Sequence, residues 1–448
     1  MLRKTNFFIL LFLGLLSVSG QFPGTPAIPL KETRNIFGGT GSEFNNSMVS
    51  TADGGYVLAG RTQSNDGDVS GNHGIADFWI VKFSSHGSIE WKKTFGGSDN
   101  DAVGNIIQTA DGGYAVTGST QSNDGDVSGN HGTATNDIWV IKLSSTGTLQ
   151  WQKTFGGTNN DYGKVIIQTS DGGYILGGET NSINGDVTGF QGNFDFWVVK
   201  ISSTGVLQWQ KTLGGTGTEY LYSLIQTSEG GYIMTGQASS NNGDVSGNHG
   251  AVDLWVAKIS STGTLQWQKT FGGTNSEYGQ VIIQTSDGGY TIAGYTQSND
   301  GDVSGNHGGT DYWVIKLNSA GTLQWQKAFG GTGNDAGRSM IRTADGGYVV
   351  AGNTQSNDGD ISGNHGSSDF WVLKLSSNGT LEWQKTLGGT SSDVAYAVIP
   401  GENGYIVSGT STSNDGDVAG PTVGAGGFLI LKLDTNGNNV RLYDDITP

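Results

Sequence analysis

The stretch 164–215 reads KVIIQTSDGGYILGGETNSINGDVTGFQGNFDFWVVKISSTGVLQWQKTLGG. It contains four short runs rich in β-branched and aromatic residues: KVIIQT, YILGGET, FWVVKIS and VLQWQKTL. The tight turns SDGG and STG separate the first run from the second and the third from the fourth, and such glycine turns join antiparallel neighbours. A long acidic loop separates the second run from the third. The stretch therefore predicts one four-stranded antiparallel sheet.

The same unit recurs along the chain, and the turn DGGY or a close variant marks each copy. The markers begin at Asp53, Asp111, Asp171, Glu229, Asp287, Asp345 and Glu402. Seven four-stranded units of nearly constant period predict an all-β fold, a seven-bladed β-propeller of four-stranded antiparallel blades. A parallel β-helix is the alternative, but its repeat would be shorter. A helical solenoid is excluded because no stretch shows helical periodicity.

Tryptophan recurs at two places in the repeat, and lysine at one. On the third run the tryptophans are Trp79, Trp139, Trp197, Trp255, Trp313 and Trp371, and Phe428 is expected in the seventh place. On the fourth run they are Trp91, Trp151, Trp209, Trp267, Trp325 and Trp383. We interpret both sets as packing between adjacent blades. The W-x-x-K lysines are expected to place their amines beside a carboxylate or carbonyls at a strand end. These are Lys82, Lys142, Lys200, Lys258, Lys316, Lys374 and Lys432.

The N-terminal segment contains an isolated fourth-run tail, TRNIFGG at Thr33–Gly39. Its Phe37 matches Phe95 and Phe155 of complete copies, whereas the seventh copy ends without this pattern. We therefore expect the N-terminal segment to pair as a strand in the last blade. This pairing would close the ring and remove two exposed sheet edges.

The first twenty residues have the composition of a secretory signal. A basic start is followed by an apolar core and by the small residues SVSG. No other apolar run approaches transmembrane length. We therefore expect residues 1–20 to be a signal peptide and residues 21–448 to be a single propeller domain. The protein is expected to be secreted and monomeric, in the periplasm, at the cell surface or outside the cell.

Composition excludes two classes of function. The formal net charge of −17 argues against nucleic-acid binding, which needs a basic surface. The chain has no cysteine, so disulfides and thiol chemistry are absent. Strong acidity instead suits cation binding.

The loop between the second and third runs has the spacing of a calcium-binding loop. Counted from Asp66, oxygen-bearing side chains stand at positions 1, 3, 5 and 12, with glycine at position 6. The four residues are Asp66, Asp68, Ser70 and Asp77. Alternate side chains can converge on one ion, and the last carboxylate closes the shell. The alternative is that this acidic loop only forms Asx turns and is solvated.

The same count works in four further copies. Their candidate ligands are Asn184, Asp186, Thr188 and Asp195; Asn242, Asp244, Ser246 and Asp253; Asp300, Asp302, Ser304 and Asp311; and Asp358, Asp360, Ser362 and Asp369. Copy two has two inserted residues before its closing acid, and copy seven has lost positions 5 and 12, so both are expected to be weak or empty. Their residues are Asp124, Asp126, Ser128 and Asp137 in copy two, and Asp415, Asp417, Ala419 and Gly426 in copy seven.

At these loops the sequence resembles the D-x-D-x-D-G calcium loops of dockerin modules and of integrin propellers. The resemblance covers about twelve residues per copy and implies calcium as a cofactor. It departs at position 5, where Ser or Thr replaces an acid or amide and removes a charge.

In an up-and-down sheet the long loops and the links between copies lie on one face. Each link also brings an acid to that face: Glu43, Asp101, Asp161, Glu219, Glu277, Asp335 and Asp393. We expect partners to bind there, because binding residues favour such loops. In five of the copies one histidine also lies there, which we interpret as a solvated residue rather than a zinc ligand. These are His73, His131, His249, His307 and His365.

The segment KLSSTGTLQW at Lys142–Trp151 resembles the tryptophan motif of pyrroloquinoline-quinone-type propellers. Over its mature length the chain also resembles exported bacterial proteins built from DGGY…W-x-K-T-F-G-G repeats. The resemblance implies a propeller and export, and no established activity. The quinone enzymes use a vicinal disulfide, which this chain cannot form.

The copies are nearly interchangeable, and no catalytic motif stands apart from them. We therefore predict a non-enzymatic binding or scaffold protein that engages a glycan or an extracellular protein. The alternative is a glycan hydrolase or lyase that uses loop carboxylates near the axis.

Overall fold

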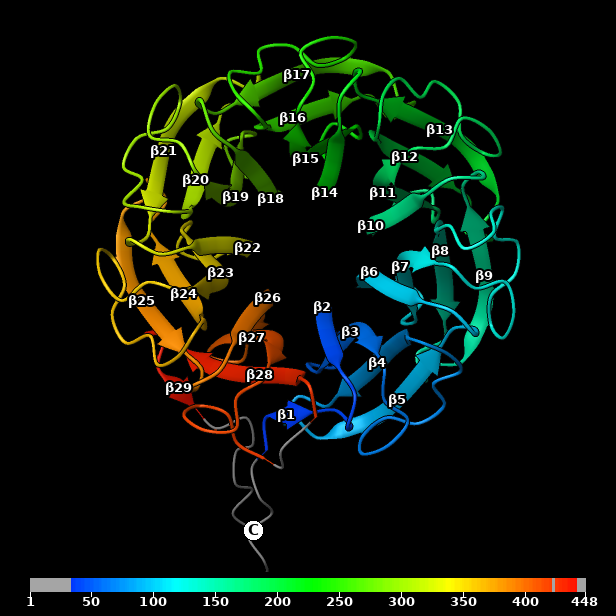
Figure 1. Ribbon diagram of the computed structural model, residues 1–448, viewed down its shortest axis with the longest axis horizontal. Coiled ribbons are helices and arrows are strands. Elements are labelled where there is room, and N and C mark those ends of the chain that lie inside the picture. Colours follow the sequence, from blue (N-terminus) through cyan, green and yellow to red (C-terminus); the bar gives the residue numbers. More distant parts are fainter. Residues whose placement is uncertain (1–33, 421–423, 441–448) are drawn as a thin grey trace, which may run out of the picture. The chain divides into compact units, whose positions relative to one another are not determined.

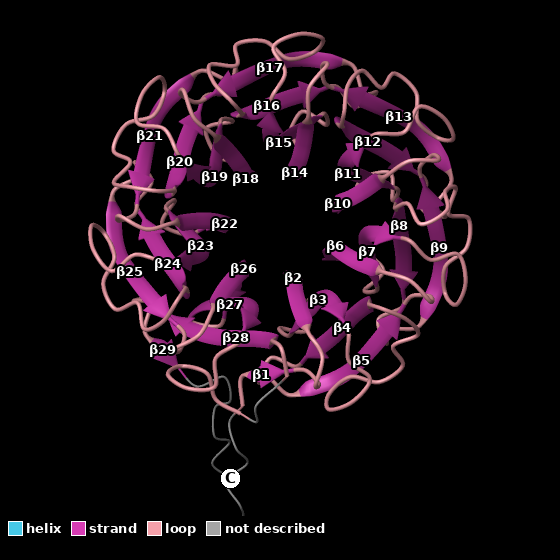
Figure 2. Cartoon of the chain, in the orientation of Figure 1, coloured by secondary structure: helices cyan, strands magenta, loops and turns pink. Residues whose placement is uncertain are grey.

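The computed structural model describes residues 34–420 and 424–440, so the predicted signal peptide lies outside the described residues. The described residues form strands, turns and loops without a helix, and thus contain no helix able to span a membrane. Seven antiparallel sheets stand around a common axis (Figure 1, Figure 2). The predicted all-β, seven-bladed propeller is confirmed.

Each blade runs outward from the axis in sequence order. The innermost strands are β2 (Glu43–Ser50), β6 (Asp101–Gln108), β10 (Asp161–Gln168), β14 (Glu219–Gln226), β18 (Glu277–Gln284), β22 (Asp335–Arg342) and β26 (Asp393–Gly401). The second strands are β3 (Tyr56–Thr62), β7 (Tyr114–Thr120), β11 (Tyr174–Thr180), β15 (Tyr232–Ala238), β19 (Tyr290–Thr296), β23 (Tyr348–Thr354) and β27 (Gly404–Ser411).

The third strands are β4 (Asp77–Phe83), β8 (Asp137–Leu143), β12 (Asp195–Ile201), β16 (Asp253–Ile259), β20 (Asp311–Leu317), β24 (Asp369–Leu375) and β28 (Gly427–Asp434). The outer strands are β5 (Ile89–Phe95), β9 (Leu149–Phe155), β13 (Leu207–Leu213), β17 (Leu265–Phe271), β21 (Leu323–Phe329) and β25 (Leu381–Leu387). Blade 1 begins with β2, blade 2 with β6, and so on to blade 7, which begins with β26.

Burial explains the sequence pattern of each strand. The third strand β8 is buried at every residue, whereas the outer strand β9 is exposed or partly buried up to its last residue, Phe155, which is buried. Trp139 of blade 2 is fully buried, and its ring centroid lies 4.5 Å from that of Phe78 in blade 1. The outer-strand Trp151 is half-buried and lies 6.0 Å from Tyr174 of blade 3. Both tryptophan sets thus pack between blades, as predicted.

The repeated lysine has a structural role. Lys142 donates from Nζ to the Leu143 carbonyl at 3.0 Å and to Asp111 Oδ2 at 2.9 Å. Hydrogen bonds from Thr109, together with the Lys142 ammonium, lower the pKa of Asp111 to about 2. The lysine therefore ties the third strand to the DGGY turn of its own blade.

The ring closes through the N-terminal segment. Strand β1 (Ile36–Phe37) pairs with β28, with Ile36 opposite Leu429 and Phe37 opposite Phe428. Strand β29 (Asn439–Val440) pairs with the other end of β28. The predicted closure is confirmed, and the outer strand of blade 7 is built from both ends of the chain.

One residue assignment in blade 7 was wrong. Phe428 pairs with Phe37 as Phe78 pairs with Phe95, so Phe428 occupies the place of Phe78. The tryptophan place belongs to Leu429, which lies opposite Gly409. The sequence contains the evidence for this correct assignment. Lys432 follows Phe428 by four positions, whereas the lysine of W-x-x-K follows its tryptophan by three.

Candidate functional sites: the blade junctions and the central channel

The predicted calcium loops contact the segment that links one blade to the next. In blade 1, Asp66 accepts hydrogen bonds from the backbone N and Oγ1 of Thr40, both at 2.8 Å. Asp68 accepts from the Gly38 backbone N at 3.1 Å and from Arg34 at 2.6 Å. Positions 1 and 3 of the loop therefore hold the incoming link.

This contact repeats at every junction. Position 1 accepts from the third residue of the link, through Asp124, Asn184, Asn242, Asp300, Asp358 and Asp415. Position 3 accepts from the first glycine of the link, through Asp126, Asp186, Asp244, Asp302, Asp360 and Asp417. Carboxylate and amide oxygens thus satisfy backbone donors that would otherwise lack partners.

Position 5 points to a different neighbour. The Ser128 hydroxyl accepts a hydrogen bond at 2.6 Å from Gln152 of the outer strand in the same blade. The corresponding residues Thr188, Ser246, Ser304 and Ser362 make the same contact. In blade 1, the Ser70 carbonyl accepts from Thr94.

The closing acid at position 12 is buried and holds the loop histidine. Asp77 is fully buried, and its Oδ2 accepts from the backbone N and Nδ1 of His73, both at 2.8 Å. The same pair forms in blades 2, 4, 5 and 6: His131 with Asp137, His249 with Asp253, His307 with Asp311, and His365 with Asp369. These histidines are therefore not only solvated, as predicted, but anchored on the closing acid. In blade 3 the backbone N of Gln191 takes this place on Asp195.

In six of the seven links the acid lies next to the closing acid of the preceding blade; the exception is Glu43, because blade 7 has glycine at position 12. Asp101 accepts from the Gly97 backbone N at 2.8 Å, from the Ser122 hydroxyl at 3.0 Å and from Thr120. A Cβ added at Gly96 would lie 2.5 Å from Asp77 Oδ1 and 2.7 Å from Asp101 Oδ2. Only glycine fits between these two carboxylates.

Burial makes these paired acids weak. It raises the pKa of Asp101 and of Asp161 to about 6, and that of Asp195 to about 7. In the described residues, the Oδ1 atoms of six closing acids have no hydrogen-bond partner: Asp77, Asp137, Asp195, Asp253, Asp311 and Asp369. Each of these junctions therefore contains a buried oxygen that a proton would satisfy.

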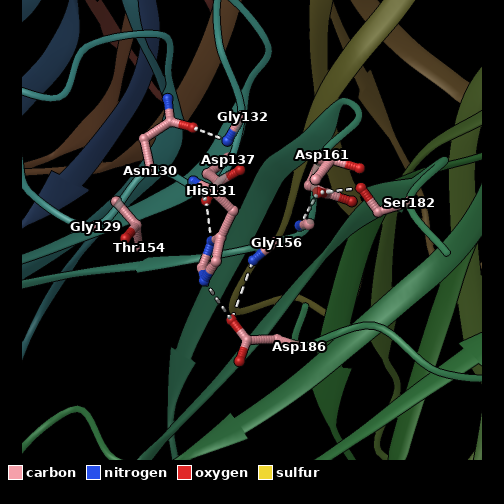
Figure 3. A network of polar contacts seen from close by, with 12 residues as sticks. Gly129, Asn130, His131, Gly132, Asp137, Thr154, Gly156, Asp161, Ser182 and Asp186 are labelled. Carbon is pink, nitrogen blue, oxygen red and sulfur yellow. Dashed lines mark hydrogen bonds and ion pairs between the residues drawn. The ribbon is translucent and has the colours of Figure 1, made fainter. Parts of the chain in front are cut away.

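Figure 3 shows the junction of blades 2 and 3. His131 lies between Asp137 of its own blade and Asp186 of the next, with its Nε2 3.9 Å from Asp186. The same Asp186 accepts from the Gly156 backbone N. The polar network therefore spans the junction from one blade to the other.

The four predicted ligands of a loop thus reach separate partners. Within residues 34–420 and 424–440, no three Asp, Glu, His or Cys side chains are placed to hold a metal ion together. These residues form interblade latches as they stand. Calcium binding by the loops stays a prediction.

The blades differ at the central channel, whose lining residues were not among the predicted site residues. Each innermost strand carries a β-bulge, and a bulge can re-aim a side chain. The bulged residues are Asn46, Gly104, Lys164, Tyr222, Gln280, Arg338 and Tyr396. All seven line one cavity of about 520 Å³.

A second variable position supports the bulged residues. On the second strands it is occupied by Arg61, Ser119, Glu179, Gln237, Tyr295, Asn353 and Thr410. Three of these bind the bulged residue of their own blade. Glu179 pairs with Lys164 at 3.2 Å, Gln237 accepts from the Tyr222 hydroxyl at 2.9 Å, and Asn353 accepts from Arg338 Nε at 3.3 Å. The sequence could have indicated this site, because the bulged position and its second-strand neighbour both vary from copy to copy while most of the repeat does not.

Comparisons with known proteins fit this geometry at the level of the fold. No family model matches the chain. An alignment of 266 positions with the regulatory protein FlaEY of Caulobacter vibrioides shows 24% identity, and it covers 54% of this chain and 28% of that protein.

Two solved structures illustrate the likeness of fold. Puromycin hydrolase superposes with a TM-score of 0.50 at 10% identity, over 90% of this chain and 55% of that one. The WD40 β-propeller domain of Doa1 gives 0.49 at 11% identity, over 89% and 96%. At 10% identity the likeness to puromycin hydrolase concerns the fold alone.

Proposed function

We propose that the protein is an exported, non-catalytic binding protein that engages a glycan or an extracellular partner at the channel mouth on its long-loop face. One observation carries the proposal: the positions that repeat build the junctions, whereas the positions that vary meet in the channel cavity. A rigid frame with one individual site is what a binding propeller needs.

The arrangement of charges favours binding over the alternative of a hydrolase or lyase. Glycoside hydrolysis needs two carboxylates that face each other across the substrate. Within the described residues, the cavity lining contains the cations Lys164 and Arg338 and no carboxylate. The loop carboxylates contact backbone amides of the links instead.

A glycan array read in calcium and in chelator tests the proposal. We expect saturable binding of at least one glycan, and no turnover of the bound ligand. Saturable hydrolysis or elimination that a single loop-carboxylate substitution abolishes would instead support the enzyme. A blank array combined with no captured extracellular protein would contradict binding altogether.

We also predict that the loops bind calcium and that calcium therefore stabilises the protein. At about 10 mM calcium and a dissociation constant near 1 mM, each occupied loop adds about 1.4 kcal/mol to stability. The melting temperature of the full chain is therefore expected to rise with calcium and less with magnesium.

The stability that calcium adds must be distinguished from the stability that is lost when the hydrogen bond between the loop and the link is broken. Asp302→Asn removes a charge but can keep an oxygen acceptor for Gly272, and it should reduce the increment. Asp417→Asn makes the same change in copy seven, where glycine occupies position 12, and should leave the increment unchanged. Identical melting curves in calcium and in chelator for the wild-type protein would refute calcium binding.

A further inference from the structure

We propose that the channel cavity binds a carboxylate-bearing sugar, with Arg338 receiving the carboxylate and the tyrosines and amides around it receiving the sugar ring and hydroxyls. This inference rests on the proposed function and specifies its ligand. The site comprises the seven bulged residues together with their neighbours Tyr162 and Asn136.

Charge is the first argument. The protein has a formal net charge of −17, yet the described lining of the cavity carries two cations and no carboxylate. Lys164 is already compensated by Glu179, a buried residue whose Oε1 lies 3.2 Å from the lysine amine. Arg338 has no acidic partner among the described residues. The cavity therefore has an uncompensated positive charge and selects an anion.

The geometry of Arg338 identifies the kind of anion. Its Nε donates to Asn353, which fixes the plane of the guanidinium, and its Cζ lies 5.1 Å from the ring centroid of Tyr396. Its two terminal nitrogens make no hydrogen bond or ion pair within the described part of the chain. A planar fork held in this way matches the two oxygens of a carboxylate.

The remaining lining identifies the rest of the ligand. Asn46 and Gln280 each offer both a donor and an acceptor, which suits a ligand with many hydroxyls. Asn136 adds an acceptor oxygen, because its amide nitrogen donates to Asn160 and to the Tyr162 hydroxyl.

Tyr222, whose hydroxyl donates to Gln237, can still accept a hydrogen bond from a sugar hydroxyl. The rings of Tyr222 and Tyr396 add aromatic surface on which the apolar side of a sugar can pack. A single charged group among so many neutral hydrogen-bonding groups fits a sugar acid better than a fatty acid or a small inorganic anion.

The volume of the cavity limits the size of the ligand. The volume of about 520 Å³ lies within the range of small-molecule sites, roughly 300–1,000 Å³. It suits a mono- or disaccharide. The ligand is therefore a free sugar acid or a terminal unit of an acidic polysaccharide.

Calorimetric titration of the full chain tests this assignment. The probes are D-galacturonate and D-glucuronate, their short oligomers, and neutral D-galactose and D-glucose. We expect at least one acidic sugar to bind tenfold or more tightly than its neutral counterpart, with an affinity that falls as salt is added. Tighter binding of the oligomer than of the monomer would identify a polysaccharide end as the source.

Substitutions identify the residue responsible. Arg338→Gln should weaken acidic-sugar binding at least tenfold and abolish the preference over the neutral sugar. Arg338→Lys should retain part of the preference, because it keeps the charge but not the fork. Arg342→Gln is the matched control: Arg342 lies on the same strand but outside the cavity lining, donates to Ser286, and should change nothing. Circular dichroism and melting curves verify that each variant is folded.

The outcomes separate the two proposals. If acidic and neutral sugars bind equally and Arg338→Gln has no effect, the carboxylate assignment is overturned while the binding function stands. If a protein partner binds the channel face and none of these sugars does, the sugar assignment is again overturned. If no sugar, other glycan or protein binds, the proposed function itself fails.

Discussion

Removal of residues 34–39 is expected to lower the free energy of unfolding by several kcal/mol. The deletion removes Ile36 and Phe37, which are 2% and 1% exposed. Loss of one such buried side chain costs about 2–5 kcal/mol. It also leaves part of β28 as an open sheet edge and removes the partners of Asp68 at the junction of blades 7 and 1. Denaturant unfolding monitored by tryptophan fluorescence measures the effect.

Two point variants refine this experiment. Phe37→Ala removes an edge contact with Phe83, at 5.1 Å between ring centroids, and should cost about 3–5 kcal/mol by itself. Val440→Ser in β29 changes an exposed side chain at the other end of the same blade and should cost little. A deletion variant that unfolds at the wild-type denaturant concentration would show that β1 contributes nothing to closure.

Stability is expected to increase as the pH falls from 8 to about 5. Asp101, Asp161 and Asp195 have pKa values of about 6, 6 and 7 in the folded protein because burial disfavours their charged forms. Their value in the unfolded chain is near 3.8. Between these limits the folded state holds protons that the unfolded state has lost, so acidification favours folding. Between pH 8 and 5 each of these three junctions contributes on the order of 1–3 kcal/mol.

The gain ends near pH 4, where the unfolded chain also becomes protonated. Turn carboxylates act in the opposite direction below that point. Asp111, whose pKa is lowered to about 2, stabilises the fold only while it is charged, and its contribution is lost as the pH falls through that range. The melting temperature should therefore pass through a maximum between about pH 4 and 6.

A matched pair of variants assigns the effect to the junctions. Asp195→Asn removes the charge at a junction where Gln191 supplies only a backbone donor, so it should reduce the pH dependence between 8 and 5. Asp111→Asn removes a charge that is paired with Lys142, and it should leave that part of the curve unchanged. A wild-type melting temperature that falls steadily from pH 8 to 5 would contradict the raised pKa values.

The sequence predicted the fold because each copy specifies a complete blade. The DGGY turn, the apolar third run and the recurring Trp139 position define local pairing without reference to distant residues. Even the long-range pairing of Phe37 was predictable, because the fourth-run motif is missing from the seventh copy and is present instead before the first copy. Because seven copies share the same motif positions, an error in assigning the strands of one copy shows up on comparison with the other six.

The candidate site was harder to predict, for physical reasons. A one-dimensional spacing such as that of Asp66, Asp68 and Asp77 does not reveal that each carboxylate faces a different backbone segment. The channel residues could not be recognised from the repeat pattern, because they stand at the positions that differ from copy to copy. Lys164 and Arg338 belong to different copies, and only the closed ring brings them to one cavity.

The composite outer strand of blade 7 has a consequence for how the chain assembles. Ile36 is among the earliest described residues to be synthesised, yet its partner Leu429 follows about 390 residues later. Blades 1 to 6 are built from neighbouring segments and can form in order, whereas blade 7 must wait for both ends. Joining ends so far apart carries an entropic cost that local pairing does not. Until that step, the nascent protein exposes a half-made blade, and this is the interval in which a chaperone or a protease has the most to bind.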